Sequence, residues 1–261
     1  MHLFLSPHYD DAVLSCGGLI HKLVAEGSRV VVRTIMGGAP SPGQLPDTPI
    51  THSLHERWAS GENPVDARIR EDEAAVRSLG AEAEHLVYWM DCIYRLSRKG
   101  EPLYTNDASL WGDIHPDDIA GQLLPTLVLG PRDVLRGLYI PLGVGHHVDH
   151  RIVRNWGLEL RKHYPWVALR FYEEYPYLQT AGSVEKALEY YAQLEPPLKL
   201  EPEMVMLQEA DVAAKIKAVG LYTSQISSFW TNADAMDAGI RTSLTRTGNG
   251  QPAERLWKII Q

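Results

Sequence analysis

The sequence has little of what marks several large protein classes. Its 261 residues include only two cysteines, Cys16 and Cys92, which excludes a disulfide framework. No cluster of lysine or arginine stands out and the formal net charge is −8, whereas a nucleic-acid-binding surface needs a basic stripe. No apolar run approaches the roughly 18 residues of a membrane span. We therefore expect neither nucleic acid nor a membrane span.

The start of the chain lacks the pattern of a secretory signal. Met1 leads directly into a strand-like segment, without a charged region followed by a long apolar one. On that ground alone, a cytoplasmic location is expected. The apolar fraction of 44% and the charged fraction of 22% are typical of a globular protein.

Short apolar segments alternate with amphipathic ones over the first two thirds of the chain. Strands are predicted at 2–6, 29–35, 84–89, 135–140 and 167–172, and helices at 12–25, 67–79, 117–129 and 150–163. Unbroken apolar strands are typical of parallel strands that are buried on both faces. The alternation predicts a Rossmann-like α/β fold with a doubly wound, mostly parallel sheet.

The remaining sequence shows no repeat, linker or break in composition. Helices are expected at 184–194 and over most of 210–230, a strand at 198–208, and a closing strand or helix at 254–260. We predict one domain over 1–261, with a core of about 1–175 that residues 176–261 complete. The Gly/Pro-rich segment 36–65 reads as a long loop that leaves the carboxyl end of a strand, and thus as a wall of the site. Whether it is an ordered lid is left open.

Ionisable residues follow two of the predicted strands. Pro7 to Asp11 (PHYDD) comes after the first strand, and His147 to His150 (HVDH) follows the fourth and opens a helix. Ligands bind at the carboxyl ends of the strands in open α/β sheets. The first motif alone could be an aspartate helix cap, worth about 1 kcal/mol, beside an incidental histidine. Together the two motifs favour a metal site, because catalytic zinc commonly takes three His or carboxylate ligands and leaves a position for water.

A third string, His115 to Asp118 (HPDD), does not follow a predicted strand. It opens the apolar helix at 117–129, where proline and aspartate suit a helix N-terminus and its dipole. We interpret it as a helix cap and not as a second metal site.

The first motif with the following Gly17-Gly18, joined to the later HxDH string, resembles the LmbE-like (PIG-L) family of zinc-dependent de-N-acetylases. Tyr172 to Glu174 and Ser224-Gln225 agree with this resemblance. It implies a zinc-dependent hydrolase that removes an N-acetyl or related N-acyl group from an amino sugar or sugar conjugate. Another divalent metal such as Fe²⁺ in place of zinc is left open.

The resemblance also implies catalytic roles. His8, Asp11 and His150 would bind the metal. Asp10 would be the general base that takes a proton from the zinc-bound water. His147 would be the protonated partner that stabilises the oxyanion and assists departure of the amine.

Supporting roles follow from the same resemblance. Asp149 would orient His147 or support the shell around the ligands. Arg70 and Asp91 match positions that hold sugar hydroxyls or orient the loops, so they are the predicted substrate-binding residues. The chain departs from the usual pattern at Tyr9, where many members have proline, and at Tyr222, where a histidine often stands.

Other functions remain compatible with these residues. The same site could serve an amidase of thiol or other acylated small-molecule conjugates, because the loops that select the substrate are the least readable part. A non-catalytic Rossmann-like module that binds a metal or ligand would need no base such as Asp10. A dinucleotide enzyme is disfavoured, since no Gly-x-Gly-x-x-Gly follows the first strand. A homo-oligomer is left open.

Overall fold

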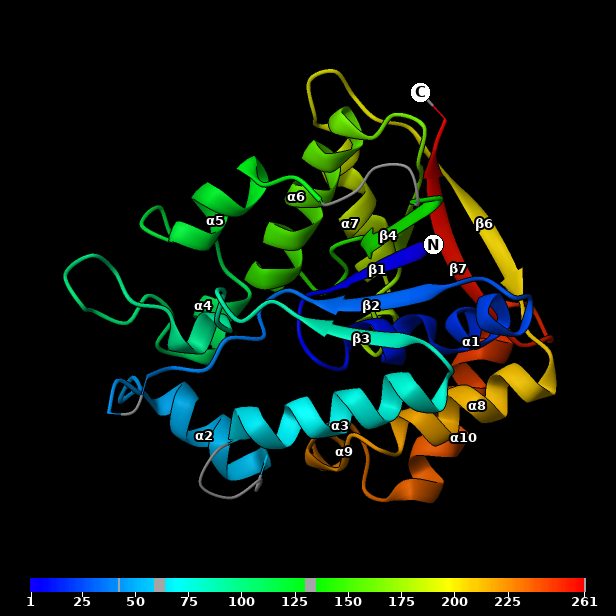
Figure 1. The fold of residues 1–261 in the computed structure, drawn as a ribbon, viewed down its shortest axis with the longest axis horizontal. Helices are drawn as coiled ribbons and strands as arrows, with labels where there is room; N and C mark the ends of the chain where they lie inside the picture. The colour runs from blue at the N-terminus through cyan, green and yellow to red at the C-terminus, as the bar shows by residue number, and fades with distance from the viewer. Residues whose placement is uncertain (42, 59–63, 130–134, 261) are drawn as a thin grey trace.

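A single seven-stranded sheet forms the centre of the computed structural model, which describes residues 1–41, 43–58, 64–129 and 135–260. Its strands are β1 (His2–Ser6), β2 (Val30–Thr34), β3 (Glu82–His85), β4 (Gly137–Pro141), β5 (Ala168–Tyr172), β6 (Leu200–Met206) and β7 (Ala253–Ile259). They stand in the order β3-β2-β1-β4-β5-β7-β6 (Figure 1). β1 to β5 are parallel, and β7 is antiparallel to both β5 and β6. The predicted single α/β domain with a mostly parallel sheet is confirmed.

Helices cover both faces of this sheet. They are α1 (Asp11–Ala25), α2 (Pro49–Trp58), α3 (Pro64–Ser78), α4 (Asp107–Leu110), α5 (Ile119–Leu123), α6 (Val148–His163), α7 (Ser183–Ala192), α8 (Glu209–Val219), α9 (Thr223–Phe229) and α10 (Ala233–Thr247), with 3-10 turns η1 (Cys92–Tyr94), η2 (Leu124–Thr126) and η4 (Tyr177–Gln179). In Figure 1, α1, α3 and α8 lie below the sheet, and α5, α6 and α7 lie above it. Both layers are needed because both sheet faces are apolar.

Alternate residues of the central strands supply the two cores. Phe4 and Val32 pack in the cluster under α1, α3 and α8, whereas Leu5 and Val31 pack in the cluster under α6. Successive strand side chains point to opposite faces. All four are buried, which explains why these strands read as unbroken apolar runs.

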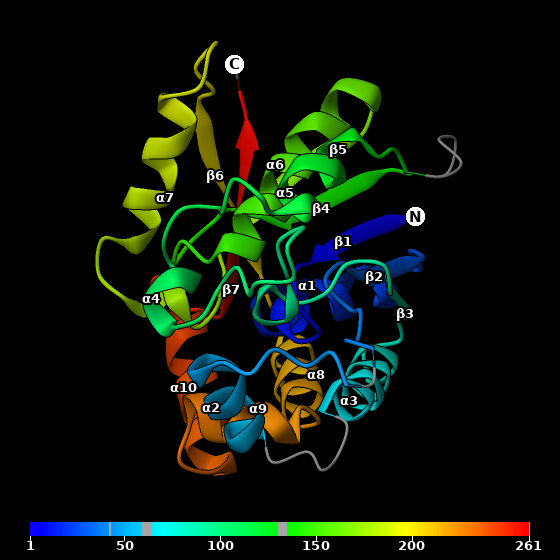
Figure 2. The same cartoon turned by 90° about the vertical axis from the view of Figure 1, so that its left-hand side faces the viewer.

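The order of the strands reverses between β1 and β4. From β1 the chain continues to β2 and β3 on one side, and later crosses to β4 and β5 on the other. Such a switch point leaves a crevice outside the carboxyl ends of the strands, where open α/β sheets bind ligands. Figure 2 looks onto this edge, where α2, α4 and α9 gather. Both ionisable motifs follow the two strands that flank the switch point.

Segment 36–65 is not the long loop that its glycines and prolines suggest. Residues 49–58 form α2, and residues 59–63 lie outside the described part. Pro49 suits the first turn of a helix because its missing N–H has no partner to lose there. The hydroxyl of Thr48 accepts a hydrogen bond from the N–H of Thr51 at 3.2 Å, which caps the helix start. The pair Thr48-Pro49 therefore marks the start of a helix and is readable in the sequence.

Two predicted boundaries are wrong. β3 ends at His85, not at residue 89, and Val87 and Tyr88 are exposed beyond it. The helix expected at 117–129 is the short α5 followed by η2. Pro125 explains that break, since a proline inside a helix removes a backbone donor and clashes with the preceding turn.

The C-terminal part extends the same sheet, because β7 pairs with β5. The helical stretch expected at 210–230 is broken into α8 and α9. Helix α10 was not predicted; its Met236, Ile240 and Leu244 are buried in the core beside α8. Its N-terminus carries a readable signal, because Asn232 accepts a hydrogen bond from the N–H of Ala235 at 2.8 Å.

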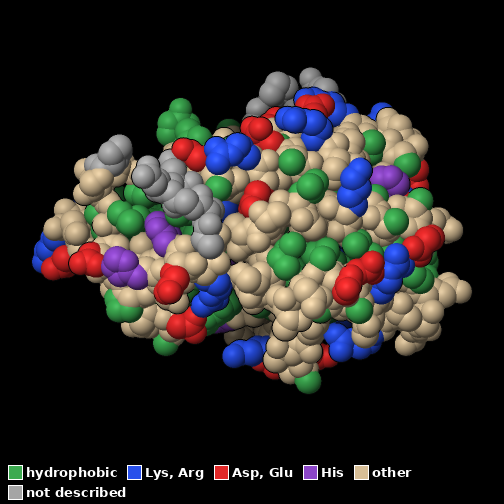
Figure 3. Space-filling model, turned by 90° about the horizontal axis from the view of Figure 1, so that it is seen from below, with side chains coloured by type: hydrophobic (Ala, Val, Ile, Leu, Met, Phe, Trp, Pro, Cys, Tyr) green, Lys and Arg blue, Asp and Glu red, His purple; other side chains and the backbone are tan. Residues whose placement is uncertain are grey.

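Two properties of the exterior bear on the sequence-based expectations. None of the helices in the described part of the chain is long and apolar enough to cross a membrane. On the lower face, seen in Figure 3, acidic and basic side chains are interspersed.

Replacement of Gly157 tests how closely α6 packs on β4. A methyl group there would lie 2.7 Å from Ile140 Cγ2, so Gly157→Ala should lower the free energy of unfolding by about 1–3 kcal/mol. The matched control is Gly220→Ala at the end of α8, where the nearest atom would be 3.4 Å away. Urea denaturation of both variants is the measurement. Equal midpoints for the two would contradict the tight α6–β4 contact.

Candidate metal centre and active site

The turn between β1 and α1 is fixed by short hydrogen bonds. Ser6 Oγ donates to the carbonyl of His8 at 2.6 Å and accepts from the N–H of Ala12 at 3.0 Å. The N–H of His8 donates to Asp11 Oδ2 at 2.8 Å. These bonds hold the first motif in one conformation at the end of a buried strand.

The loop between β4 and α6 depends on two glycines and a buried glutamate. Gly143 and Gly145 have φ of 96° and 84°, which L side chains rarely adopt. The carboxylate of Glu174 accepts hydrogen bonds from the N–H of Gly143 at 2.8 Å and of the next residue at 3.0 Å. His147 then caps α6, with Nδ1 accepting from the N–H of Asp149 at 3.2 Å.

The two motifs meet at the switch point. Asp11 Oδ2 lies 3.2 Å from His8 Nδ1 and 3.3 Å from His150 Nε2. The ring of His147 is centred 5.1 Å from that of His8 and 5.3 Å from that of His150. Ligand atoms of the three histidines lie within 4.8 Å of one another. All four residues are buried, so the sequence-predicted cluster exists in the fold.

The donor atoms of this cluster fit a divalent cation. His150 Nε2 is buried and makes no hydrogen bond in the described structure, although it faces the carboxylate of Asp11. On the other side of the ring, His150 Nδ1 lies 3.3 Å from Glu174 Oε1. A carboxylate behind an imidazole is the usual support of a metal-binding histidine.

Electrostatics point the same way. Burial lowers the pKa of His150, but the carboxylates of Asp11 and Glu174 together outweigh it and raise that pKa to about 9. Burial raises the pKa of Asp11, but His150 and His8 outweigh it and hold that pKa well below its usual range. The buried carboxylates thus favour a positive charge at this place. Without a metal ion the charge comes from protonation of the imidazoles, and a bound metal ion would supply it instead.

Asp10 lines the cavity beside these residues and has its own partner. Its Oδ1 lies 3.4 Å from a guanidinium nitrogen of Arg68, and another nitrogen of Arg68 lies 3.9 Å from Asp91 Oδ2. Arg68 also stands 4.5 Å from the ring centre of Trp58. Burial and the charge of Asp11 raise the pKa of Asp10 to about 6, although Arg68 lowers it.

The structure does not bring Arg70 into the site. Its side chain is exposed on α3, and Arg68 lines the cavity in its place. Residues two apart on a helix point about 200° away from each other. Arg68 lies on the buried stripe of α3 with Val65, Asp72 and Val76, at helical spacing. That periodicity was the sequence signal that separates the two arginines.

Asp149 supports His8 and not the side chain of His147. Asp149 Oδ2 lies 3.0 Å from His8 Nε2 and accepts from the N–H of Cys92 at 2.9 Å, and Oδ1 accepts from Arg95. The hydrogen bond between Asp149 and His147 uses the backbone N–H of Asp149 and not its carboxylate. Of the two roles expected for Asp149, the geometry matches support of the shell around the ligands.

The string His115 to Asp118 is a helix cap, as expected. Asp118 accepts from the N–H of Ala120 at 3.0 Å at the start of α5. Its other oxygen accepts from the hydroxyl of Tyr104 at 2.8 Å and pairs with Arg95 at 3.0 Å. The string therefore has a structural role, because its Asp118 caps α5 and pairs with Arg95.

The two departures from the usual family pattern are structural contacts. Tyr9 donates to the carbonyl of Gly37 at 2.5 Å, and Tyr222 donates to Asp72 Oδ1 at 2.7 Å. Neither tyrosine lines the cavity. Tyr222 therefore joins α3 to the start of α9.

Comparison with known proteins agrees with this geometry. The family model described as GlcNAc-PI de-N-acetylase (PIG-L) matches residues 3–160. The chain belongs to the PIG-L family. The 2'-N-acetylparomamine deacetylase of Niallia circulans is 32% identical over 189 residues, which are 68% of this chain and 67% of that protein.

Solved structures of deacetylases share the fold over nearly the whole chain. The zinc-inhibited form of teicoplanin deacetylase has a TM-score of 0.80 at 24% identity, and covers 99% of this chain and 97% of its own. The A40926 pseudoaglycone deacetylase has a TM-score of 0.73 at 26% identity, and covers 99% of this chain and 96% of its own. The predicted family is confirmed.

The candidate site opens into a cavity of about 180 Å³. Aromatic and apolar side chains from several elements form much of its wall, namely Leu54, Trp58, Leu110, Trp111, Tyr177 and Phe229. Segment 36–65 contributes through α2, as expected of a wall. Polar groups converge at its floor: Asp10, Asp11, His8, His147, Arg68 and Asp91. An apolar wall with a few convergent polar groups is the usual form of a small-molecule site.

Helix α1, which carries the first PIG-L motif, is broken within its length. Cys16 has non-helical φ and ψ of −124° and 16°, so the backbone beyond it loses regular helical partners. The carboxylate of Glu254 on β7 replaces them by accepting from the N–H of Gly18 at 3.0 Å and of Leu19 at 2.8 Å. A Cβ atom at Gly18 would collide with Leu207, at 2.5 Å from its Cδ1. Because they have no side chains, Gly17 and Gly18 leave room for Lys215 and Leu207 to pack against α1.

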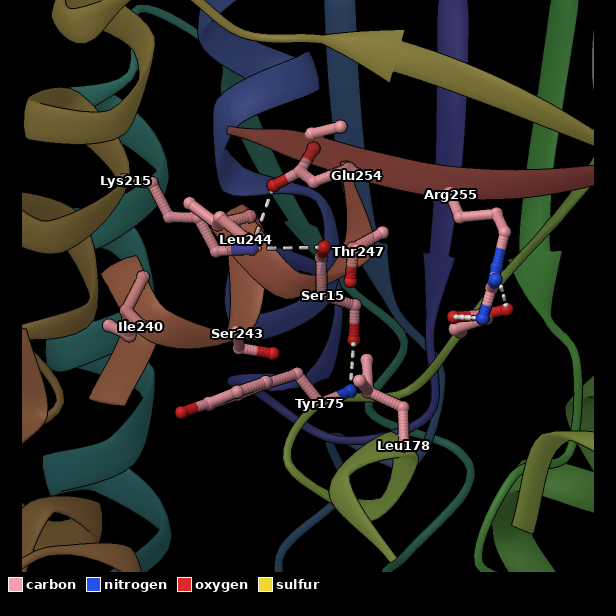
Figure 4. Close-up of a pocket in the computed structure, with 12 residues that line it drawn as sticks. Ser15, Tyr175, Leu178, Lys215, Ile240, Ser243, Leu244, Thr247, Glu254 and Arg255 are labelled. Carbon is pink, nitrogen blue, oxygen red and sulfur yellow. Dashed lines mark hydrogen bonds and ion pairs between the residues drawn. The ribbon is translucent and has the colours of Figure 1, made fainter. Parts of the chain in front are cut away.

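Lys215 on α8 completes this support (Figure 4). Its Nζ donates to Glu254 Oε1 at 2.7 Å and to the carbonyl of Ser15 at 3.0 Å. The hydroxyl of Ser15 accepts from the N–H of Tyr175 at 3.2 Å, and Tyr175 lines the cavity at the candidate site. The buried pair thus ties the motif helix and the cavity wall to the C-terminal strands and helices.

Loss of Lys215 should destabilise the PIG-L fold strongly. Lys215→Met leaves Glu254 buried without its cation, which costs about 3–5 kcal/mol. The control is Lys258→Met, because Lys258 pairs with Glu201 at 2.8 Å at the surface, where a pair is worth about 0–1 kcal/mol. Unfolding free energies from urea denaturation measure both. Similar losses for the two variants would refute the role of the buried pair.

Proposed function

We propose that this protein is a zinc-dependent hydrolase that removes an acetyl group from the nitrogen of an amino sugar. The observation that carries the proposal is the meeting of Asp11 with His8 and His150, whose buried Nε2 faces Asp11 without a hydrogen bond, with Asp10 and His147 lining the cavity beside them. Membership of the PIG-L family and similarity to a deacetylase of an N-acetylated aminoglycoside support it.

His8, Asp11 and His150 are the proposed metal ligands. Two histidines and one carboxylate suit zinc, and also Fe²⁺. When bound, the ion supplies a Lewis acid that polarises the amide oxygen and lowers the pKa of a coordinated water. Glu174 and Asp149 hold the outer nitrogens of His150 and His8, which fixes the orientation of both rings.

Asp10 is the proposed general base. With its pKa raised to about 6, it is ionised at neutral pH and basic enough to take a proton from the attacking water. The same proton can then pass to the amine nitrogen as the carbon–nitrogen bond breaks. Arg68 holds Asp10 in place from the side.

His147 is the proposed stabiliser of the tetrahedral intermediate. Its Nδ1 accepts a backbone hydrogen bond, so the proton of the neutral ring is on Nε2. Burial and the charge of His8 lower the pKa of His147 well below its usual range. In the free enzyme His147 is therefore a neutral donor, which can give a hydrogen bond from Nε2 to the oxygen of the intermediate while it keeps its own proton.

The cavity walls suit a sugar ring. Trp58, Trp111 and Tyr177 present aromatic surface, and Arg68 and Asp91 present a donor and an acceptor at the floor. Aromatic rings pack against the apolar faces of ligands, while the charged pair can bind hydroxyl groups. The names of two similar proteins, 2'-N-acetylparomamine deacetylase and teicoplanin deacetylase, agree with a substrate that carries an acyl group.

Two substitutions should separate catalysis from metal binding. Asp10→Asn should keep one zinc per chain but lose acetate release by about 10²–10⁴-fold, because the base is gone. His150→Ala should lose zinc, because a ligand is gone. Zinc content after dialysis and acetate release from N-acetylglucosamine and N-acetylated aminoglycosides are the measurements. Full turnover by zinc-loaded Asp10→Asn, or no acetate from any substrate with wild type, would refute the proposal.

Variants of Arg68 and Arg70 form a matched pair that tests which arginine contributes to substrate binding. Arg68→Met should raise KM about tenfold or more, because Arg68 lines the cavity and holds Asp10 and Asp91. Arg70→Met should leave KM and kcat unchanged, because its side chain is exposed. Steady-state kinetics with one acetylated amino sugar measure KM and kcat for both variants. A larger effect at Arg70 would restore the assignment that the sequence suggested.

A further inference from the structure

Cys92 is a buried thiol next to the site that the proposed reaction does not use. It begins η1 and is fully buried. Its Sγ lies 3.9 Å from His147 Nε2, and its N–H donates to Asp149 Oδ2 at 2.9 Å. Asp91 and Ile93 on either side line the cavity, so Cys92 sits directly behind the cavity wall.

Two ordinary roles for this cysteine do not fit. Burial, and then the charge of Asp149, raise the pKa of the Cys92 thiol well above its usual range, so the free side chain is a protonated, weak nucleophile. It also does not line the cavity in which a substrate would bind. Both cysteines are free thiols, which leaves no disulfide.

The surroundings of Cys92 are those of a metal ligand. One ligand atom each from Cys92, His147 and Asp149 lies within 4.8 Å of the other two, and all three residues are buried. Thiolate, imidazole and carboxylate are the ligand types of zinc. The 3.9 Å between Sγ and Nε2 is close to the ligand–ligand separation of roughly 3.6 Å that tetrahedral zinc bond lengths give.

The ring of His8 separates this cluster from the proposed catalytic centre. His8 Nδ1 faces Asp11 at 3.2 Å, whereas His8 Nε2 faces Asp149 Oδ2 at 3.0 Å. The two groups of ligands therefore lie side by side on the two nitrogens of His8, and His147 of the second group is also within 4.8 Å of ligand atoms of His8 and His150. Occupation of one affects the other.

We propose that Cys92, His147 and Asp149 form a second metal site, which a thiophilic divalent cation such as Zn²⁺ or Co²⁺ occupies in excess and which inhibits the enzyme. Binding replaces the S–H bond of Cys92 with a metal–sulfur bond, and the proton leaves to solvent. The inhibitory part rests on the proposed function, because it assigns His147 to the reaction.

This site is weaker than the first for a structural reason. Asp149 Oδ2 already accepts hydrogen bonds from His8 and from the backbone of Cys92, and Oδ1 accepts from Arg95. An entering ion must displace or share these donors, one of which is the guanidinium of Arg95, whereas the ring nitrogens that face Asp11 in the first site are themselves metal ligands. The first equivalent of metal therefore fills the catalytic centre.

Inhibition follows from the residues that the second ion occupies. His147 Nε2 would be bound to the ion and unable to donate to the oxygen of the intermediate. Asp149 would at the same time be drawn away from His8, and loss of such outer support weakens a catalytic metal site by about 10–100-fold.

Titration of the metal-free protein with Co²⁺ tests the site directly. The first equivalent should produce no sulfur-to-cobalt charge-transfer band in the near ultraviolet. The second should produce this band and lower acetate release. Cys92→Ala should lose the band and raise the concentration of excess metal that halves activity by about tenfold or more. Cys16→Ala is the matched control, because Cys16 is a buried free thiol in the core and should leave both readouts unchanged.

The outcomes separate the two proposals. A thiolate band at the second equivalent in an enzyme that releases no acetate would support the site while refuting the proposed function. The second site is refuted if wild type shows no such band, or if folded Cys92→Ala is inhibited by the same metal concentration. Circular dichroism and a second variant, Cys92→Ser, show whether the fold is retained.

Discussion

The burial of several carboxylates at one edge of the sheet constrains the rest of the structure. Asp10, Asp11, Asp149 and Glu174 are each no more than 6% exposed. A buried charge is costly unless it is paired and hydrogen-bonded. The loops around the switch point provide the partners: the guanidinium groups of Arg68 and Arg95, the backbone N–H groups after β4, and the imidazoles of His8 and His150.

The same constraint explains the division of roles among neighbouring residues. Asp11 is shared between His8 and His150, and its pKa is low. Asp10 faces Arg68 and the cavity, and its pKa is raised to about 6. Two adjacent aspartates at a helix start diverge by about 100°. One is therefore suited to hold a cation and the other to exchange a proton.

The C-terminal part of the chain stabilises the N-terminal motif. Helix α1 is broken at Cys16, and its interrupted backbone is satisfied by Glu254 and Lys215, more than 190 residues later in the sequence. Figure 4 shows both side chains converging on the helix from β7 and α8. The position of Asp10 and Asp11 consequently depends on β7 and α8, although neither element reaches the cavity.

Much of the fold was predictable because its signals are local. The central strands β1, β2 and β4 are short, mostly apolar and buried segments, and each ionisable motif follows a strand that flanks the switch point. Helices α2 and α10 were missed because prolines and sparse apolar residues hid them, although Thr48 and Asn232 mark their starts.

Contacts between distant segments were not predictable in this way. The sequence did not show that Asp149 supports His8 or that Glu174 supports His150, since these pairs are separated by 141 and 24 residues. Arg70 was preferred to Arg68 because the string was matched without regard to the helical face on which each lies. Periodicity resolves that choice, whereas the carboxylate partners require the folded loops.

The central claim is the position of the first metal ion. A crystal structure of the protein with one equivalent of zinc, with anomalous scattering measured at the zinc edge, tests it most directly. The account predicts a single anomalous peak within about 2.0–2.2 Å of ligand atoms of His8, Asp11 and His150. A single peak at Cys92, His147 and Asp149, or one that contacts neither group, would contradict it.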